Sequence, residues 1–231
     1  MALRRPLRRV HLWLGWLVGV PLLFWTASGL FMAARPIDEV RGTALRAPAP
    51  MVAASVNVRL PDPGKRAVKS LGLEMQGGRP VWISAFADGT AARASTDTGA
   101  WLPPVGEQEA RAIARAAYAP PSAIAAATRT PADKPPLDLR RPRPAWGVAF
   151  ADGAHLYVDA DTGSVLALRT GQWRLYDWMW GLHIMDLQGR ENSSHFLLIA
   201  FATAAFIATL LGLVLLPLAS RRRRRGPEKD L

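Results

Sequence analysis

The side chains of this chain with the widest chemical range are its four histidines, His11, His155, His183 and His195. A neutral imidazole nitrogen can ligate a metal ion or a haem iron, and histidine also titrates near neutral pH. The chain has no cysteine, which excludes disulfides, Cys-x-x-Cys redox chemistry and thiolate metal sites. The chemistry open to the histidines therefore depends on the elements that hold them.

Two apolar stretches, residues 10–34 and 193–218, lie near the two ends of the chain. Each can cross the hydrocarbon core of a bilayer, which takes about 20 helical residues. Each has arginines on its outer side, Arg4, Arg5, Arg8 and Arg9 before the first stretch and Arg221 to Arg225 after the second. Because arginine favours the cytoplasmic side, the pattern predicts two transmembrane helices with cytoplasmic ends, residues 1–9 and 219–231, and an exported middle. The first stretch is too long for a signal-peptide core of about 7–15 residues, so we expect a retained anchor.

The net charge of +11 comes mainly from the two arginine groups. Without them and the tail charges Glu228, Lys229 and Asp230, 19 basic residues stand against 16 acidic ones. This near balance gives no reason to expect nucleic-acid binding, and arginine beside a span is typical of contact with anionic lipid. No G-x-G-x-x-G pattern follows a predicted strand, so a nucleotide-binding domain is not expected.

The exported region contains a repeat. Residues 79–102 align without a gap with residues 143–166, and twelve of the 24 positions are identical. Each copy predicts a β meander with Asp-Gly and Asp-Thr-Gly turns, and residues 91–95 predict a weaker strand that is shortened or at an edge. Residues 106–118 favour a helix, whereas residues 119–142, with six prolines, predict a loop or an extended connector.

Other polar side chains of the exported region have structural explanations. Most of the repeat's aspartates, Asp88, Asp97, Asp152, Asp159 and Asp161, stand where turns need the side-chain hydrogen bond of aspartate. Ser193 and Ser194 precede His195, but serine beside asparagine is an ordinary helix N-cap, so no hydrolase is predicted. His155 reads as an exposed polar residue of a strand.

A helix followed by strands and by Tyr157-Val158-Asp159, Thr162-Gly163 and Leu166 resembles a PepSY domain over Glu107 to Leu168. With the flanking spans, the chain is similar to the PepSY-associated transmembrane proteins. The expected fold is an α+β membrane protein, in which two transmembrane helices flank a periplasmic PepSY-like domain of antiparallel β meanders plus helix, residues 35–171. The resemblance implies location in a bacterial inner membrane.

Both predicted spans carry small residues on one face. On the first span these positions are His11, Gly15, Gly19, Leu22, Thr26, Gly29 and Ala33, and on the second His195, Ala202, Ala205, Thr209 and Gly212. Small faces allow close approach, so we expect Gly15 and Gly19 to lie near Gly212 and Thr209. Packing does not explain a histidine on each face, because an ionisable side chain at a span is costly and usually functional.

His183 lies in a tryptophan-rich stretch, residues 172–192, that predicts an interfacial amphipathic segment on the exported side. A bend after it could bring His183 towards His195, whereas His11 would lie about 30 Å away across the span. Two histidines at one depth are a usual way of holding haem b. Zinc usually takes four ligands, which two histidines alone do not supply.

We therefore predict His11, His183 and His195 as axial ligands of haem b, with no catalytic side chain. Because His11 lies a bilayer away from the other two, the prediction requires a homodimer or a larger membrane complex, in which His11 pairs with its counterpart. Some PepSY-associated transmembrane proteins look like haem-binding reductases that pass electrons across the inner membrane to ferric siderophores during iron uptake. The His-x-Trp-x-Gly run at His11 and Leu182-His183 are similar to their histidine-bearing positions, although those relatives have more spans and more histidines.

An alternative function remains open at this stage. The spans could serve only as anchors, with the PepSY-like domain binding a periplasmic peptide or partner protein as a non-catalytic accessory of a membrane complex. If the chain is an enzyme, the resemblance implies a haem-dependent reductase of the ferric-siderophore type or an electron-transfer subunit.

Overall fold

The computed structural model describes residues 4–52 and 58–223, with side chains up to residue 216. It separates into two compact units. The first, called the hairpin unit here, holds the residues up to Arg35 together with those from Leu175 onward, and the second, the sheet domain, spans Pro36–Arg174. The predicted basic ends, residues 1–9 and 219–231, lie partly outside the described residues.

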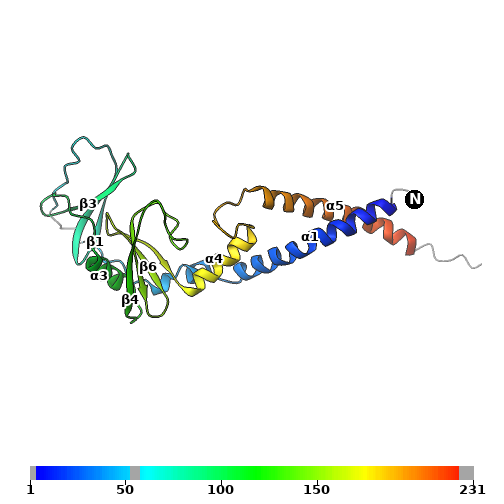
Figure 1. The fold of residues 1–231 in the computed structure, drawn as a ribbon, viewed down its shortest axis with the longest axis horizontal. Helices are drawn as coiled ribbons and strands as arrows, with labels where there is room; N and C mark the ends of the chain where they lie inside the picture. The colour runs from blue at the N-terminus through cyan, green and yellow to red at the C-terminus, as the bar shows by residue number, and fades with distance from the viewer. Residues whose placement is uncertain (1–3, 53–57, 224–231) are drawn as a thin grey trace, which may run out of the picture. The chain divides into compact units, whose positions relative to one another are not determined.

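The hairpin unit is built on two long apolar helices, α1 (Arg4–Ala33) and α5 (Phe196–Arg223). The two helices pack against each other, as Figure 1 shows in blue and in orange to red. Within them, Arg5–Ala33 and Phe196–Leu216 are long and apolar enough to cross a membrane. Most of their large apolar side chains, Trp13, Trp16, Leu17 and Phe206 among them, are exposed, which suits helices surrounded by lipid.

The side of α1 that packs against the rest of the hairpin unit carries buried and half-buried side chains at heptad spacing. They are His11, Leu14, Val18, Pro21 and Ser28. At about 100° per residue, Gly15 and Gly19 lie on the far side of His11 from Leu14 and Val18. Both glycines are exposed, and a Cβ added at either would meet no atom within 4 Å. The predicted packing of Gly15 and Gly19 against Gly212 and Thr209 is therefore wrong. The ring of His11, which needs a hydrogen-bond partner, turns towards α5 and contacts Gly212 instead.

Helix α4 (Gly171–His183) precedes a folded connector, residues 184–195, that leads into α5. Its exposed Leu175, Trp178 and Trp180 give it the aromatic character of an interfacial helix. The observed helix ends at His183, so the remainder of the predicted amphipathic segment, residues 184–192, is connector.

The sheet domain contains two antiparallel sheets. The first joins β1 (Val68–Gln76), β2 (Arg79–Phe86) and β3 (Ala91–Ser95); the second joins β4 (Ile124–Thr130), β5 (Ala145–Phe150), β6 (His155–Asp159) and β7 (Val165–Arg169). Helix α3 (Glu107–Ala117) lies between the sheets in sequence, and α2 (Ile37–Val40) and the 3-10 turn η1 (Thr43–Leu45) precede them. The predicted class, two apolar helices flanking an α+β region with antiparallel sheets, is confirmed, and β3 is an edge strand as expected.

Two strands were not predicted. Strand β4 lies inside the proline-rich region 119–142, so the prediction of a loop there is wrong for residues 124–130. The six prolines of that region flank the strand and leave Ile124–Thr130 free to pair with β5. Strand β1 pairs with β2 in the same way, and each of the two first strands has a bulge near its start.

The bulges show that the repeat is longer than the aligned residues. Val68 pairs with Phe86 in the first copy, and Ile124 pairs with Phe150 at the equivalent position of the second. The turns also match, since Gly89 and Gly153 adopt φ values of 85° and 84° that only glycine adopts without strain. The two copies are thus three-stranded meanders of one design, and the second copy adds β7.

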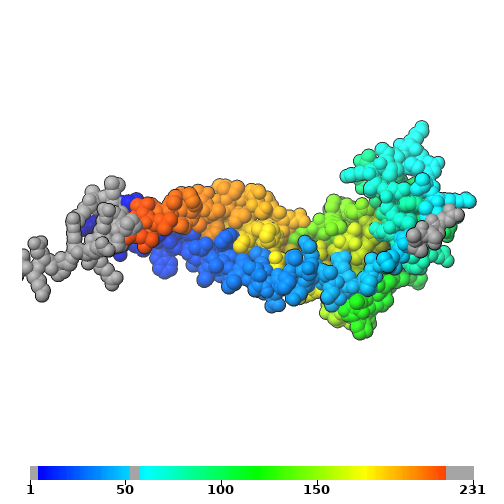
Figure 2. Space-filling view, turned by 180° about the vertical axis from the view of Figure 1, so that it is seen from behind, coloured from blue at the N-terminus to red at the C-terminus, as the bar shows by residue number. Residues whose placement is uncertain are grey.

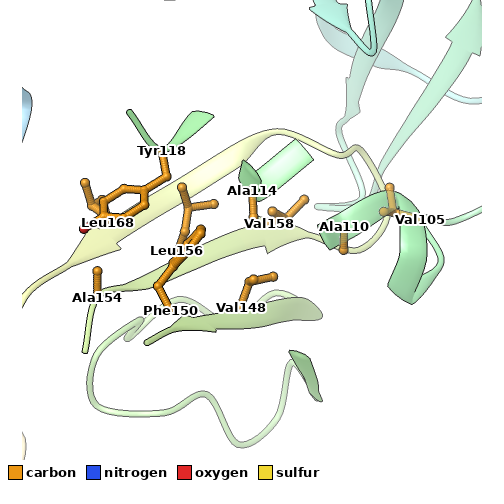
Figure 3. Packing of buried hydrophobic residues seen from close by; sticks show 10 residues of the cluster. All are labelled: Val105, Ala110, Ala114, Tyr118, Val148, Phe150, Ala154, Leu156, Val158 and Leu168. Atoms are coloured by element: carbon orange, nitrogen blue, oxygen red, sulfur yellow. The ribbon is translucent and has the colours of Figure 1, made fainter. Parts of the chain in front are cut away.

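The main core of the domain lies between α3 and the second sheet. Figure 3 shows Ala110, Ala114 and Tyr118 clustered with Val148, Phe150, Leu156, Val158 and Leu168 of the strands. Alanine on the helix lets its backbone approach the sheet, where larger side chains fill the space. Burying each large apolar side chain of this kind contributes about 1.5–3 kcal/mol.

Candidate functional site

The hairpin unit holds three of the four histidines, and each of them bonds a backbone carbonyl. His11, in the second turn of α1, makes a hydrogen bond of 3.0 Å from Nδ1 to the carbonyl oxygen of Ala208 on α5. Since a carbonyl oxygen only accepts, the proton lies on Nδ1 of the neutral ring. The lone pair of Nε2 then remains, and no hydrogen bond occupies it among the described residues.

His183, the last residue of α4, is held against α1. Its Nδ1 lies 3.1 Å from the carbonyl oxygen of Trp25 and 3.2 Å from Oγ of Ser28. The ring stacks on Trp25 with centroids 4.7 Å apart and an interplanar angle of 17°. A Cβ at Gly29 would come within 3.0 Å of Cε1, so this glycine provides the space for the ring. His183 is therefore fixed on three sides, with Nε2 as its remaining nitrogen.

His195 precedes α5 and bonds the connector. Its Nε2 lies 2.9 Å from the carbonyl oxygen of Ile184, the residue after His183. The structure thus brings His183 and His195 to the same end of the hairpin. It leaves the proton of His195 on Nε2, so only Nδ1, the more hindered nitrogen beside the main chain, carries a lone pair.

The connector between the two histidines is held by charged and polar contacts. Arg190 donates from Nη1 to Oδ2 of the buried Asp177 at 2.8 Å, and Trp180 donates from Nε1 to the Arg190 carbonyl oxygen. Backbone N–H groups of Asn192, Gly189 and Glu191 bond the Asp186 carboxylate. These bonds, that of Asn192 foremost, hold the pKa of Asp186 below its usual value. A fixed connector in turn fixes where Ile184 presents its carbonyl to His195.

Next to His11, α1 carries an open groove of about 370 Å³. It is lined by His11, Leu12, Gly15, Trp16, Gly19, Val20 and Leu23. The lining is apolar except at the imidazole, and the two glycines lower the helix surface beside it. Figure 2 shows α1 and α5 in space-filling form from the back.

His11, which lines the groove, has the hydrogen-bond arrangement that one axial ligand of a haem would need. An axial histidine usually donates its Nδ1–H to a carbonyl or carboxylate and ligates through Nε2, the arrangement that the bond from His11 to Ala208 would give. A flat apolar macrocycle also needs the low surface that Gly15 and Gly19 provide. His183 has the same hydrogen-bond pattern, with Nδ1 occupied and Nε2 remaining, whereas His195 has the opposite one.

His11 and His183 of one chain do not reach the same iron. From His11 to Ser28, which contacts His183, the helix rises by about 25 Å at 1.5 Å per residue. No group of three or more histidine, cysteine, aspartate or glutamate side chains that could hold a metal ion occurs among the described residues. The second ligand at the depth of His11 would have to come from another chain.

The remaining sequence candidates lie in the sheet domain. His155 is half-buried on β6, with Nδ1 3.8 Å from Oδ2 of Asp138, and burial lowers its pKa. Asp88 and Asp152 accept from the backbone of Thr90 and Ala154 in the hairpin turns, and buried Asp159 accepts from Asp161 and Thr162. Asp88, Asp152 and Asp159 therefore stabilise turns, as the sequence predicts, whereas Asp97 and Asp161 donate their backbone N–H groups to Ser95 and Asp159.

Sequence reasoning missed the partners of the histidines, Ala208, Trp25 and Ser28. Ser28 carried a usable signal, because a hydroxyl within an apolar span needs a hydrogen-bond acceptor. A backbone carbonyl such as that of Ala208 carries none, since every residue has one.

Comparison with known families decides the wider relationship. A family model described as the PepSY-associated TM region matches residues 5–230. The chain belongs to the PepSY-associated TM family. As a member it is a membrane protein, and its two apolar helices suit the TM region that the family description names. Neither the curated proteins nor the solved structures compared with the chain match it.

Proposed function

We propose that this PepSY-associated membrane protein binds haem b in its hairpin as a homodimer and passes electrons across a bacterial inner membrane. The observation that carries the proposal is the bond from His11 Nδ1 to the Ala208 carbonyl, which leaves the lone pair of Nε2 on a residue that lines an apolar groove together with Gly15 and Gly19. Haem b between two histidines supplies one-electron chemistry. The residues of the chain would set its position, its access to water and its axial field.

Each part of the hairpin has a role in this proposal. His11 and its counterpart in the second copy would ligate at the depth of Ala208, and His183, or His195 through Nδ1, at the other end of the hairpin. The stacked Trp25 and the space at Gly29 keep the ring of His183 from rotating. A fixed ring holds its lone pair in one direction, which is what an axial ligand requires.

The sides of the membrane that the transfer would join follow from the arginine groups. Positive charge at both ends of the chain favours cytoplasmic termini, and the sheet domain would then lie in the periplasm. The haem that His11 would hold would then lie on the cytoplasmic side, and the one that His183 would hold on the other, so that one-electron transfer between them would cross the membrane. The proposed acceptor is a ferric siderophore or an electron-transfer partner in iron uptake, so the chain would act as a reductase or as its electron-transfer subunit.

The absorption spectrum of the purified chain tests this function. After expression with adequate haem we expect a Soret band and one haem per chain, and His11→Ala should lose about half of that haem. Gly19→Leu should also lower it, because the leucine fills the groove without touching α5. His155→Ala, on the sheet domain, is the matched control and should retain all of it. Absence of a Soret band, or an unchanged haem content in His11→Ala, would contradict the proposal and favour an anchored, non-catalytic module.

A further inference from the structure

The two copies of the repeat share an anchor that the sequence alignment does not show. In the first copy Trp82 donates from Nε1 to the Arg59 carbonyl at 2.7 Å, and the N–H of Arg59 bonds the Thr96 carbonyl at 2.7 Å. In the second copy Trp146 bonds the carbonyl of Val105 at 2.8 Å, and the N–H of Val105 bonds the carbonyl of Ala160 at 2.6 Å. Arg59 and Val105 are therefore equivalent positions.

The two copies of the repeat share a second contact, at the point where each segment rejoins its sheet. Ala87 donates its N–H to the carbonyl of Ala67, and Ala151 donates its N–H to that of Ala123, both at 2.9 Å. Between the two contacts the second copy has residues 106–122, which include the 11 residues of α3. The first copy has only residues 60–66, Leu-Pro-Asp-Pro-Gly-Lys-Arg. This strap is too short for a helix of that length, and its prolines and glycine oppose any helix.

The missing helix leaves part of the first sheet uncovered. In the second copy Ile124, Ala127 and Val165 pack against the core under α3. Strand register and the repeat place Val68, Leu71 and Trp101 at the same positions of the first copy. These side chains are 43%, 40% and 39% exposed.

The strap covers only one end of that face. The Arg66 guanidinium lies 3.3 Å from the ring centroid of Phe86, which also packs against Trp101 at 5.8 Å. Trp101 donates from Nε1 to the Asp62 carbonyl and so holds the strap. Val68, Leu71 and Trp101, together with Leu60 of the strap, which is 69% exposed, form what we call the open face.

The border of the open face is basic. Four basic side chains lie just before the strap, on it and at the bulge of β1: Arg59, Lys65, Arg66 and Lys69. Two acidic side chains, Asp62 and Asp88, offset them in part. The helix that covers the second copy has small side chains, Ala110 and Ala114, on its buried stripe, and its first-turn acids Glu107 and Glu109 pair with Arg111 and with Arg93 of β3. The chain itself thus contains an example of the kind of helix that covers such a sheet.

We propose that the open face binds an amphipathic helix of a partner protein, with small apolar residues on one stripe and acidic residues beside it. The partner helix would take the place that α3 takes on the second sheet and would cover Val68, Leu71 and Trp101. Burying exposed apolar side chains drives such an association, and the basic border selects an acidic helix. The proposal is independent of haem binding.

Binding of a synthetic helix to the full chain in detergent tests the proposal. The probe is a fluorescent peptide with the sequence of residues 106–118, followed by anisotropy. We expect saturable binding that weakens with salt and that Leu71→Glu weakens by about tenfold or more, because a buried leucine is lost and a like charge is added. Leu137→Glu, which changes a leucine exposed to 50% elsewhere in the sheet domain, is the matched control and should bind normally.

The outcomes that overturn the proposal are distinct. Absence of binding up to about 1 mM peptide, roughly 4 kcal/mol of affinity, would exclude a helix site of useful strength. Equal loss in Leu71→Glu and Leu137→Glu would show that the peptide does not use the open face. If the wild-type chain sediments as a dimer that Leu71→Glu dissociates, the occupant is a second copy and the partner helix is wrong. None of these outcomes depends on a Soret band.

Discussion

Two buried hydroxyls of the first sheet differ in whether they have a partner. Ser84 is 1% exposed and its Oγ bonds nothing among the described residues, whereas Thr96, 2% exposed, donates to the Pro80 carbonyl at 2.8 Å. The repeat places Val148 at the position of Ser84. Because an unpaired buried hydroxyl costs about 1–3 kcal/mol, Ser84→Val should raise the free energy of unfolding by about 1 kcal/mol. Thr96→Val should lower it by a similar amount, since the Pro80 carbonyl loses its donor.

Thermal unfolding of the two variants in one detergent measures the difference. Val148 sits between cross-strand neighbours Ala127 and Leu156, and Ser84 between Leu71 and Ala92, so the space for a valine is comparable. A lower melting temperature for Ser84→Val than for the wild type would show that the space is already filled.

Two tyrosines of the sheet domain should ionise late. Burial, followed by the hydrogen bond to Asp152, raises the pKa of Tyr118 to about 12, and burial likewise raises that of Tyr157 to about 12. A raised acid pKa stabilises the fold below the unfolded value near 10, and this stability is lost as pH rises from about 10 through 12. An alkaline absorbance titration should show two tyrosines ionising near pH 12, and Tyr118→Phe should remove one of them. Removal of an ionisation near pH 10 would contradict this.

The roles of some individual side chains could be predicted from the sequence, and those of others could not. The turn aspartates were predictable because an Asp-Gly turn depends on two adjacent residues. The tautomer of each histidine was not predictable, because it depends on which ring nitrogen bonds a carbonyl oxygen. For His11 and His195 those carbonyls belong to Ala208 and Ile184, and no local pattern distinguishes one backbone carbonyl from another.

At the scale of elements, the glycines of α1 separate into two kinds. A Cβ at Gly29 would meet Cε1 of His183 at 3.0 Å, and that ring cannot retreat because it stacks on Trp25. A Cβ at Gly19 meets nothing within 4 Å. Alanine favours helix over glycine by up to about 1 kcal/mol, so Gly19→Ala should be neutral or stabilising. Gly29→Ala should be less stable than Gly19→Ala by about 1–3 kcal/mol, because this is the usual cost of overpacking.

Helix unfolding followed by circular dichroism of the full chain in detergent compares the two variants. Equal melting temperatures would mean that the contact between α4 and α1 contributes little.

Whether a strand could be predicted from the repeat depends on whether its spacing between the two copies is constant. The aligned strands β2 and β5 were predictable because their repeat keeps a constant spacing of 64 residues. The anchor residues Arg59 and Val105 are 46 residues apart, because the second copy has a longer segment with a helix before its first strand and also a longer connection from β4 to β5 than the first copy has from β1 to β2. A change of spacing breaks an ungapped comparison, so β1, β4 and the strap became visible only through hydrogen bonds and register.

At the scale of the whole molecule, the predicted topology assigns each part to a side of the membrane. Arginine at the centre of a bilayer costs about 2.5–3.5 kcal/mol on insertion scales, and the two terminal groups together hold nine arginines. Moving either group through the membrane is therefore opposed by a large barrier, which should keep both ends in the cytoplasm. A hairpin with both ends on one side places residues 36–174 on the other.

Single cysteines can test this topology, because the natural chain has none. Ala100→Cys, an exposed position beyond β3, should react with a membrane-impermeant maleimide in cells whose outer membrane has been permeabilised. Lys229→Cys, in the tail, should react only after the inner membrane is lysed. Asn192→Cys, in the exposed connector before α5, should behave like Ala100→Cys, because both precede the second span on the exported side. Labelling of Lys229→Cys in unlysed cells would show that the tail is not cytoplasmic. The predicted topology would then be wrong, and with it the basis for electron transfer from the cytoplasm to a periplasmic acceptor.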